Sequence, residues 1–183
     1  DLQRTENKQF LDIGANIGLF TIATKKYWPK AKRLCFEPNP RSRSMLKKNL
    51  ELNKLKVLIS DKAVIGKIKK NKVVFYTNEN PAMSSMVVMG GKKIKVSTIP
   101  FSEVIPSSGK TLVKIDIEGG EYDLFRDDNK SIFKKIGVLL METHDIDEVR
   151  NDKFVLSWLK NIGFKVYYEN RNIIAINTSK ISF

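Results

Sequence analysis

Residues 9–18 read QFLDIGANIG, and this stretch decides the fold of the chain. The run Gln9–Ile13 has the length of one buried strand, and it stops at the glycine-containing turn 14–18. Leu19–Tyr27 then places apolar residues at helical spacing until Trp28-Pro29 ends the pattern. A strand, a glycine turn and a helix N-terminus form a general nucleotide-binding device, because the turn and the helix present backbone N–H groups to a ligand.

The turn itself limits which nucleotide can bind. Matched to the dinucleotide pattern G-x-G-x-x-G, it offers Gly14, Asn16 and Leu19, so the second and third glycines are missing. A pyrophosphate requires close backbone approach at the second position, where Asn16 would crowd it. We therefore expect a smaller group without phosphate at this turn. The carboxylate and ammonium of a methionyl group would fit, with Asp12 on the ammonium side.

An acid beyond the turn adds a ribose to this expectation. Glu37 ends the next predicted strand, Arg33–Glu37, and follows Gly14 by 23 residues. The usual offset of a ribose-binding acid is roughly 20 residues. A carboxylate at this place accepts hydrogen bonds from both ribose hydroxyls, which indicates a nucleoside. The alternative is a solvated acid at a strand end.

The rest of the chain continues to alternate short apolar runs with helical segments, which is typical of a parallel sheet with crossover helices. The last two strands, Phe164–Tyr168 and Ile173–Asn177, are adjacent and predict an antiparallel hairpin. Between residues 67 and 100 extended pieces and the turn Gly90-Gly91 predict an inserted β-hairpin of Met86–Met89 with Ile94–Val96. We expect one α/β domain over residues 1–183, with 67–100 on its substrate side. The other predicted strands are 57–59, 111–117 and 137–142, and the other helices are 40–53, 121–135 and 153–161.

Several blocks of this sequence resemble a known family. Residues 12–21 (DIGANIGLFT), 36–40 (FEPNP) and 46–53 look like class I S-adenosylmethionine-dependent methyltransferases. Residues 114–121 (KIDIEGGE) are similar to the K-I-D-x-E-G-x-E signature of the FkbM-like family, and Glu142-Thr143-His144 resembles its E-x-H. The resemblance implies a Rossmann-like class I methyltransferase fold, with a mostly parallel seven-stranded sheet and an antiparallel final hairpin. It also implies S-adenosylmethionine as the cofactor and O-methylation of a sugar or other small molecule.

The resemblance further assigns cofactor contacts to matching positions. The methionyl end would be held by Asp12, Gly14, Ala15, Asn16 and Gly18, and the ribose by Glu37. The adenine would be flanked by Pro38, Asn39, Asp61, Lys62 and Ala63, and Asp116 would contact cofactor or acceptor. Thr98-Ile99-Pro100-Phe101 departs from the Leu-Asp that the family pattern has near this point, which affects the acceptor assignment more than the cofactor assignment.

Four titratable residues are predicted to meet at one edge of the sheet. Asp116 and Glu118 follow one strand, Glu142 and His144 follow the next, and the carboxyl ends of parallel strands lie at the same edge. There a base could take the proton of an acceptor hydroxyl, and His144, the single histidine, is the candidate base or acceptor ligand. Glu118 could instead cap a following helix. Two carboxylates and a histidine could also hold a divalent metal, but the sequence offers no dedicated ligand spacing, and we expect none.

The charge of the chain raises an alternative acceptor. The formal net charge is +13, and all of it falls within residues 25–72, which hold 16 Lys and Arg against three acids. Such a basic half can mark a nucleic-acid partner, so an RNA methyltransferase is the alternative function. Seven of these residues precede strands or lie on outer helices, away from the predicted active edge, and no base-stacking aromatics accompany them. We therefore favour the small-molecule acceptor.

Further features exclude other classes. A single cysteine, Cys35, rules out a disulfide framework and indicates a reducing compartment. The N-terminus has no secretory signal, and no apolar run approaches the roughly 20 residues of a membrane span. We expect a cytoplasmic protein with no membrane partner, from which an upstream segment has been removed. Asn16 and the C-terminal hairpin disfavour a dehydrogenase, and the acidic edge with His144 disfavours a non-catalytic scaffold.

Overall fold

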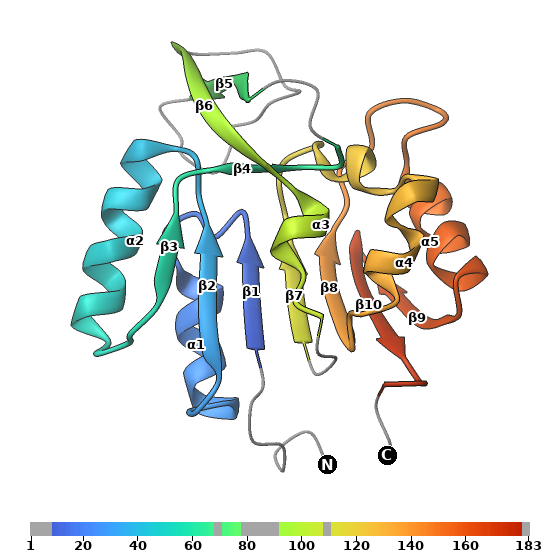
Figure 1. The fold of residues 1–183 in the computed structure, drawn as a ribbon, viewed down its shortest axis with the longest axis horizontal. Helices are drawn as coiled ribbons and strands as arrows, with labels where there is room; N and C mark the ends of the chain where they lie inside the picture. The colour runs from blue at the N-terminus through green and yellow to red at the C-terminus, as the bar shows by residue number, and fades with distance from the viewer. Residues whose placement is uncertain (1–8, 68–70, 78–91, 108–110, 181–183) are drawn as a thin grey trace.

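The computed structural model describes residues 9–67, 71–77, 92–107 and 111–180, and its centre is a seven-stranded sheet (Figure 1). The strand order is β3-β2-β1-β7-β8-β10-β9, and only β10 runs against its neighbours. The strands are β1 (Gln9–Ile13), β2 (Lys32–Phe36), β3 (Leu58–Ser60), β7 (Thr111–Ile115), β8 (Val138–Glu142), β9 (Phe164–Glu169) and β10 (Asn172–Asn177). The predicted mostly parallel sheet with an antiparallel final hairpin is confirmed.

Three longer helices connect these strands. They are α1 (Leu19–Tyr27), α2 (Pro40–Leu52) and α5 (Asp152–Asn161), all within two residues of the predicted bounds. In Figure 1, α1 lies behind β1 and β2, whereas the short helix α3 (Phe101–Val104) lies in front of β7. None of the helices in the described part of the chain has the length and apolarity that crossing a bilayer demands.

The helix predicted over residues 121–135 is wrong. The chain there forms two 3-10 turns, η2 (Glu121–Leu124) and η3 (Asp127–Asn129), followed by the four-residue helix α4 (Lys130–Phe133). Polar side chains hold the backbone out of a continuous helix, because Asp123 accepts a hydrogen bond from the Gly66 backbone N–H and Asn129 donates to the Gly66 and Leu124 carbonyls. The bond from Asn129 to Leu124 is local and competes with helix formation, and the two bonds to Gly66 tie this segment to a distant part of the chain.

The segment between β3 and β7 forms a second, three-stranded sheet above the carboxyl edge of the main one (Figure 1). Its strands are β4 (Ala63–Ile65), β6 (Lys92–Pro100) and β5 (Lys72–Thr77), in that order. β5 and β6 are antiparallel, but β4, which the sequence did not predict, pairs in parallel with β6. The hairpin partner predicted at Met86–Met89 lies outside the described residues.

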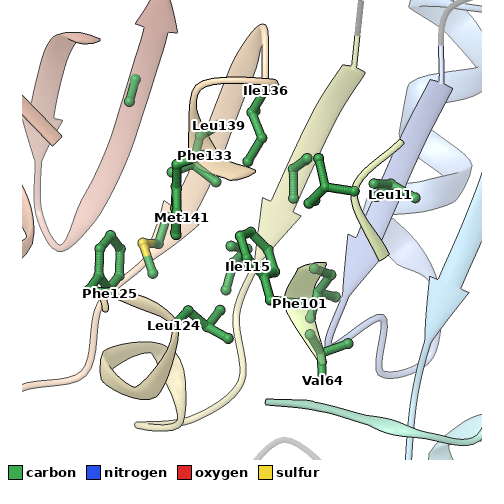
Figure 2. Packing of buried hydrophobic residues seen from close by; sticks show 14 of the residues in the cluster. Leu11, Val64, Phe101, Ile115, Leu124, Phe125, Phe133, Ile136, Leu139 and Met141 are labelled. Atoms are coloured by element: carbon green, nitrogen blue, oxygen red, sulfur yellow. The ribbon is translucent and has the colours of Figure 1, made fainter. Parts of the chain in front are cut away.

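The main core fills the space between the sheet and α3, α4 and α5 (Figure 2). Ile115, Leu139 and Met141 project from β7 and β8 onto Phe101 and Phe133. A smaller cluster on the other face joins Cys35 to Leu46 and Leu50 of α2, so Cys35 is a buried core residue. The two clusters anchor both faces of the sheet and leave its carboxyl edge to the polar loops.

Candidate active site

The turn after β1 is built around two glycines in the left-handed region. Gly14 has φ +80°, and a Cβ there would lie 1.8 Å from the backbone oxygen of Asp116. Gly18 has φ +86°, and a Cβ there would lie 2.4 Å from Leu46 Cδ1. At Gly14 both the backbone angle and the backbone oxygen exclude a side chain, whereas at Gly18 the backbone angle disfavours one and the neighbouring atom belongs to the Leu46 side chain. Between them Asn16 also has positive φ, and its buried Oδ1 has no hydrogen-bond partner among the described residues.

Glu37 follows β2 and is joined to this turn. Its Oε2 accepts from the Asn16 backbone N–H at 2.8 Å, and its Oε1 accepts from the Asn39 backbone N–H at 2.8 Å. Burial outweighs these two hydrogen bonds and raises the pKa of Glu37 to about 7. The side chain is thus a fixed, nearly buried carboxyl group at the end of β2, not a solvated strand-end acid.

Glu37 lies in the wall of a hollow at the carboxyl edge of the sheet. The hollow is lined by the predicted residues Gly14, Asn16, Glu37, Pro38, Lys62, Ala63, Asp116 and Glu118, together with Val64 and Phe75 from the small sheet. Two of the predicted adenine neighbours do not reach it. Asp61 is exposed, and Asn39 is buried with its Oδ1 accepting from the Arg41 backbone N–H as the N-cap of α2.

A second hollow, of about 520 Å³, lies beside the first, between α1 and the strands β7, β8 and β10. Its walls include the predicted residues Ala15, Asn16, Gly18, Asp116 and Glu142, and the apolar side chains of Leu19, Phe20 and Ile174. Asn16 and Asp116 line both hollows, so the two meet at the carboxyl ends of β1 and β7.

Lys114 ties the loops after β1 and β7 together. Its Nζ donates to the Gly14 carbonyl at 2.8 Å and lies 3.1 Å from Asp116 Oδ2 and 3.6 Å from Asp12 Oδ1. Burial lowers the pKa of Lys114, but the carboxylates of Asp12 and Asp116 raise it by more, so the ammonium stays charged. Asp12 has no exposed surface and also accepts from Thr21 Oγ1 at 2.5 Å. The direct contact of Asp12 with a ligand stays a prediction, and in this structure its carboxylate faces Thr21 and Lys114.

The four titratable residues predicted to meet at the edge do so around the His144 imidazole. Its Nε2 lies 3.4 Å from Glu118 Oε2 and 3.9 Å from Glu142 Oε1, and its Nδ1 lies 3.3 Å from Glu121 Oε1. The hydrogen bond with Glu121 raises the pKa of His144 to about 9, against the effect of burial. Glu118 has φ +53° and contacts His144, and the 3-10 turn that follows has Gly120 as its N-cap.

Asp116, Glu142 and His144 also offer metal-ligand atoms within 4.8 Å of one another. The sequence predicts no metal here and gives a divalent metal site as the weaker alternative. Oxygen and nitrogen ligands lie about 2.1 Å from a small divalent cation, so pairs of them are separated by at most about 4.2 Å. The Glu142 and His144 atoms, 3.9 Å apart, are within this limit, whereas Asp116 already pairs with Lys114.

Two residues of this site received no role from the sequence. Lys114 is the one charged residue in strand β7, where it stands between Val113 and Ile115, and that position was its available signal. Glu121 has no exposed surface, and its Oε1 accepts from the Ile117 backbone N–H at 2.9 Å as well as facing His144. The last acid of KIDIEGGE was visible in the sequence, but its burial beneath the histidine was not.

Comparisons with known proteins identify the family of the chain. The Methyltransferase FkbM domain matches residues 12–166. Methyltransferase sdnD of Sordaria araneosa is 25% identical over 87% of this chain and 74% of its own length. The 31-O-demethyl-FK506 methyltransferase FkbM of Streptomyces tacrolimicus is 22% identical over 90% of this chain and 75% of its own.

A solved structure shows the same fold. It is TrmK of M. capricolum in complex with the cofactor product S-adenosyl-homocysteine, which superposes with a TM-score of 0.50 at 14% identity and covers 98% of this chain and 66% of the other. The nucleotide-type turn, the acid after β2, the KIDIEGGE block and the family match lead to one conclusion. The chain belongs to the FkbM methyltransferase family and is a methyltransferase.

Proposed function

We propose that this methyltransferase uses S-adenosylmethionine to methylate a hydroxyl group of a small molecule, such as a sugar. The observation that carries the proposal is the meeting of the two hollows at Asn16 and Asp116, with Glu37 in one wall and the His144 cluster at the edge. A nucleoside with an amino-acid tail needs a site with two connected parts. The relative named for 31-O-demethyl-FK506 supports transfer to an oxygen of a small molecule.

The residues present fit this cofactor. The orphaned Oδ1 of Asn16 can accept a hydrogen bond from a ligand donor, and burial of Glu37 disfavours its charge unless polar partners such as ribose hydroxyls solvate it. Gly14 keeps the backbone free of a side chain where the methionyl group would pass. When bound, the cofactor supplies an electrophilic methyl group on a sulfonium.

The rest of the chemistry belongs to the protein's own side chains. Asp116, held by Lys114 at 3.1 Å, lies where both hollows meet and would orient the acceptor beside the methyl group. His144, with Nε2 toward the edge, would accept the hydroxyl proton. Val64 and Phe75 line the first hollow, which supports a role for the small sheet in closing over the bound molecules.

A nucleic-acid acceptor is less well supported by the positions of the basic residues. Arg33 is buried and donates to the carbonyls of Ala31 and Trp28, and Lys25 donates to the Asn53 carbonyl. Of the described basic residues between 25 and 72, only Lys62 lines the first hollow. Most of the described basic residues between 25 and 72 therefore lie outside the first hollow.

Titration calorimetry with S-adenosylmethionine tests the cofactor. Glu37→Ala should weaken binding more than tenfold, whereas Glu51→Ala, which removes an exposed acid of α2, should not. Equal affinity of wild type and Glu37→Ala would refute the ribose contact. For the acceptor, labelled-methyl transfer into fractionated cell extract should place label in small hydroxylated molecules. Label in RNA would reverse the order of the two functions.

A further inference from the structure

We propose that Glu121 is a positioning residue for His144: it holds the imidazole by Nδ1 and so presents Nε2 as the nitrogen that receives the acceptor proton. The inference rests on the proposed function. It begins with the burial of Glu121, whose side chain has no exposed surface although a carboxylate is costly to bury. A buried carboxylate such as this one needs a specific partner that offsets the cost of its burial.

The backbone fixes the Glu121 carboxylate in place. Glu118 and Gly119 both have positive φ, which turns the chain back so that Oε1 of Glu121 accepts from the Ile117 N–H at 2.9 Å. The same oxygen lies 3.3 Å from His144 Nδ1. The second oxygen, Oε2, is buried without a hydrogen-bond partner among the described residues, so His144 Nδ1 is the side-chain partner of the carboxylate, through Oε1.

This arrangement selects the tautomer of the neutral imidazole. An ionised carboxylate only accepts hydrogen bonds, so Nδ1 must carry the proton and Nε2 must carry the lone pair. Nε2 faces the open edge, with Glu118 Oε2 at 3.4 Å and Glu142 Oε1 at 3.9 Å. Asp116 is the remaining acid that acts on the ring, and its own charge is paired with Lys114.

The step that follows is balanced in atoms and charge. The acceptor oxygen forms a bond to the methyl carbon, the carbon–sulfur bond breaks with its electron pair on sulfur, and the hydroxyl proton passes to Nε2. The imidazolium that forms is stabilised by the Glu121 carboxylate, which also makes the neutral ring a stronger base. The same carboxylate keeps the ring protonated at neutral pH, so activity should rise with pH toward 9.

The single histidine makes the proposal directly measurable. In the NMR spectrum of the full chain, the His144 ring signals should titrate at about 9 in the wild type. Glu121→Gln keeps a carbonyl oxygen for the Ile117 N–H but removes the charge, so the midpoint should move at least one pH unit toward 6.5. The acid limb of the kcat/KM profile should move by the same amount. Glu51→Gln, on an exposed face of α2, should move neither.

Three outcomes decide the matter. An unchanged His144 midpoint and an unchanged pH profile in a folded Glu121→Gln protein would overturn the proposal. If this variant does not fold, ¹⁵N chemical shifts of the wild-type ring above pH 9 give the tautomer, and a proton on Nε2 rather than Nδ1 would also overturn it. Failure of the wild type to transfer any methyl group would instead contradict the proposed function and leave the NMR result to stand by itself.

Discussion

The ammonium of Lys114 lies 2.8 Å from the carbonyl oxygen of Gly14, although 100 residues separate the two in sequence. The same ammonium is the counter-ion of Asp12, which is fully buried, and of Asp116. Lys114 therefore compensates the charges of two acids where the loop after β1 touches the loop after β7.

Removing this ammonium should be strongly destabilising. Lys114→Met leaves a buried carboxylate without its counter-ion, and breaking such a pair costs about 3–5 kcal/mol. Denaturant unfolding should show a loss of this size, and the double variant Lys114→Met/Asp12→Asn should recover part of it. If the free energy of unfolding of Lys114→Met fell by less than about 1 kcal/mol, the Lys114–Asp12 ion pair would behave like a solvated surface pair.

Glu37 should make the ligand-free protein less stable as the pH rises. Its pKa is about 7 in the folded chain against 4.5 as the ordinary value, so the folded state holds the proton more tightly. Stability is thus lost between pH 4.5 and 7, by up to about 3 kcal/mol at 1.36 kcal/mol per unit. The difference in unfolding free energy between Glu37→Gln and wild type should shift in favour of the variant across this window. A pH-independent difference would contradict burial as the cause.

His144→Ala should lose turnover while its affinity for S-adenosylmethionine stays within about twofold of the wild type. The reason is that the imidazole contacts Glu118 and Glu142 at the carboxyl edge of the sheet. It is not among the residues that line the first hollow, which contains Glu37. Calorimetry and methyl-transfer assays on the same preparation separate the two effects. Full activity of the variant would remove His144 from the mechanism.

Chelation should leave methyl transfer unchanged. The Asp116 carboxylate is already paired with the Lys114 ammonium, which supplies a positive charge at this place without an ion. Activity is measured before and after dialysis against EDTA, with and without added Mg²⁺ or Mn²⁺. Loss on dialysis that either ion restores would instead assign a cation to Asp116, Glu142 and His144.

The main sheet could be predicted because its signals are local. Strands such as β1, β8 and β10 are short, mainly apolar runs, and the helix Leu19–Tyr27 has the same bounds in sequence and structure. The meeting of Glu118 with His144 also followed, since adjacent parallel strands end at one edge. By contrast, β4 is three residues long and is fixed only by pairing with β6, a partner more than 30 residues away.

Burial determines how two of the predicted site residues are placed. Asp12 and Asn39 occupy the positions that the family pattern assigns to ligand contacts, but the first is engaged by Thr21 and Lys114 and the second caps α2. A sequence shows that a polar residue is present, not whether it faces inward. Glu121 illustrates the reverse case, a side chain that acts from inside the protein.

The close approach of Gly14 to Asp116 limits how the sequence of this chain can vary. Because a single methyl group on residue 14 would collide with the backbone oxygen of Asp116 at 1.8 Å, the two loops can change only together. Selection for new acceptors must then act on the surrounding segments, such as the small sheet. A library that randomises position 14 should return glycine alone, whereas one directed at β5 has room to diversify.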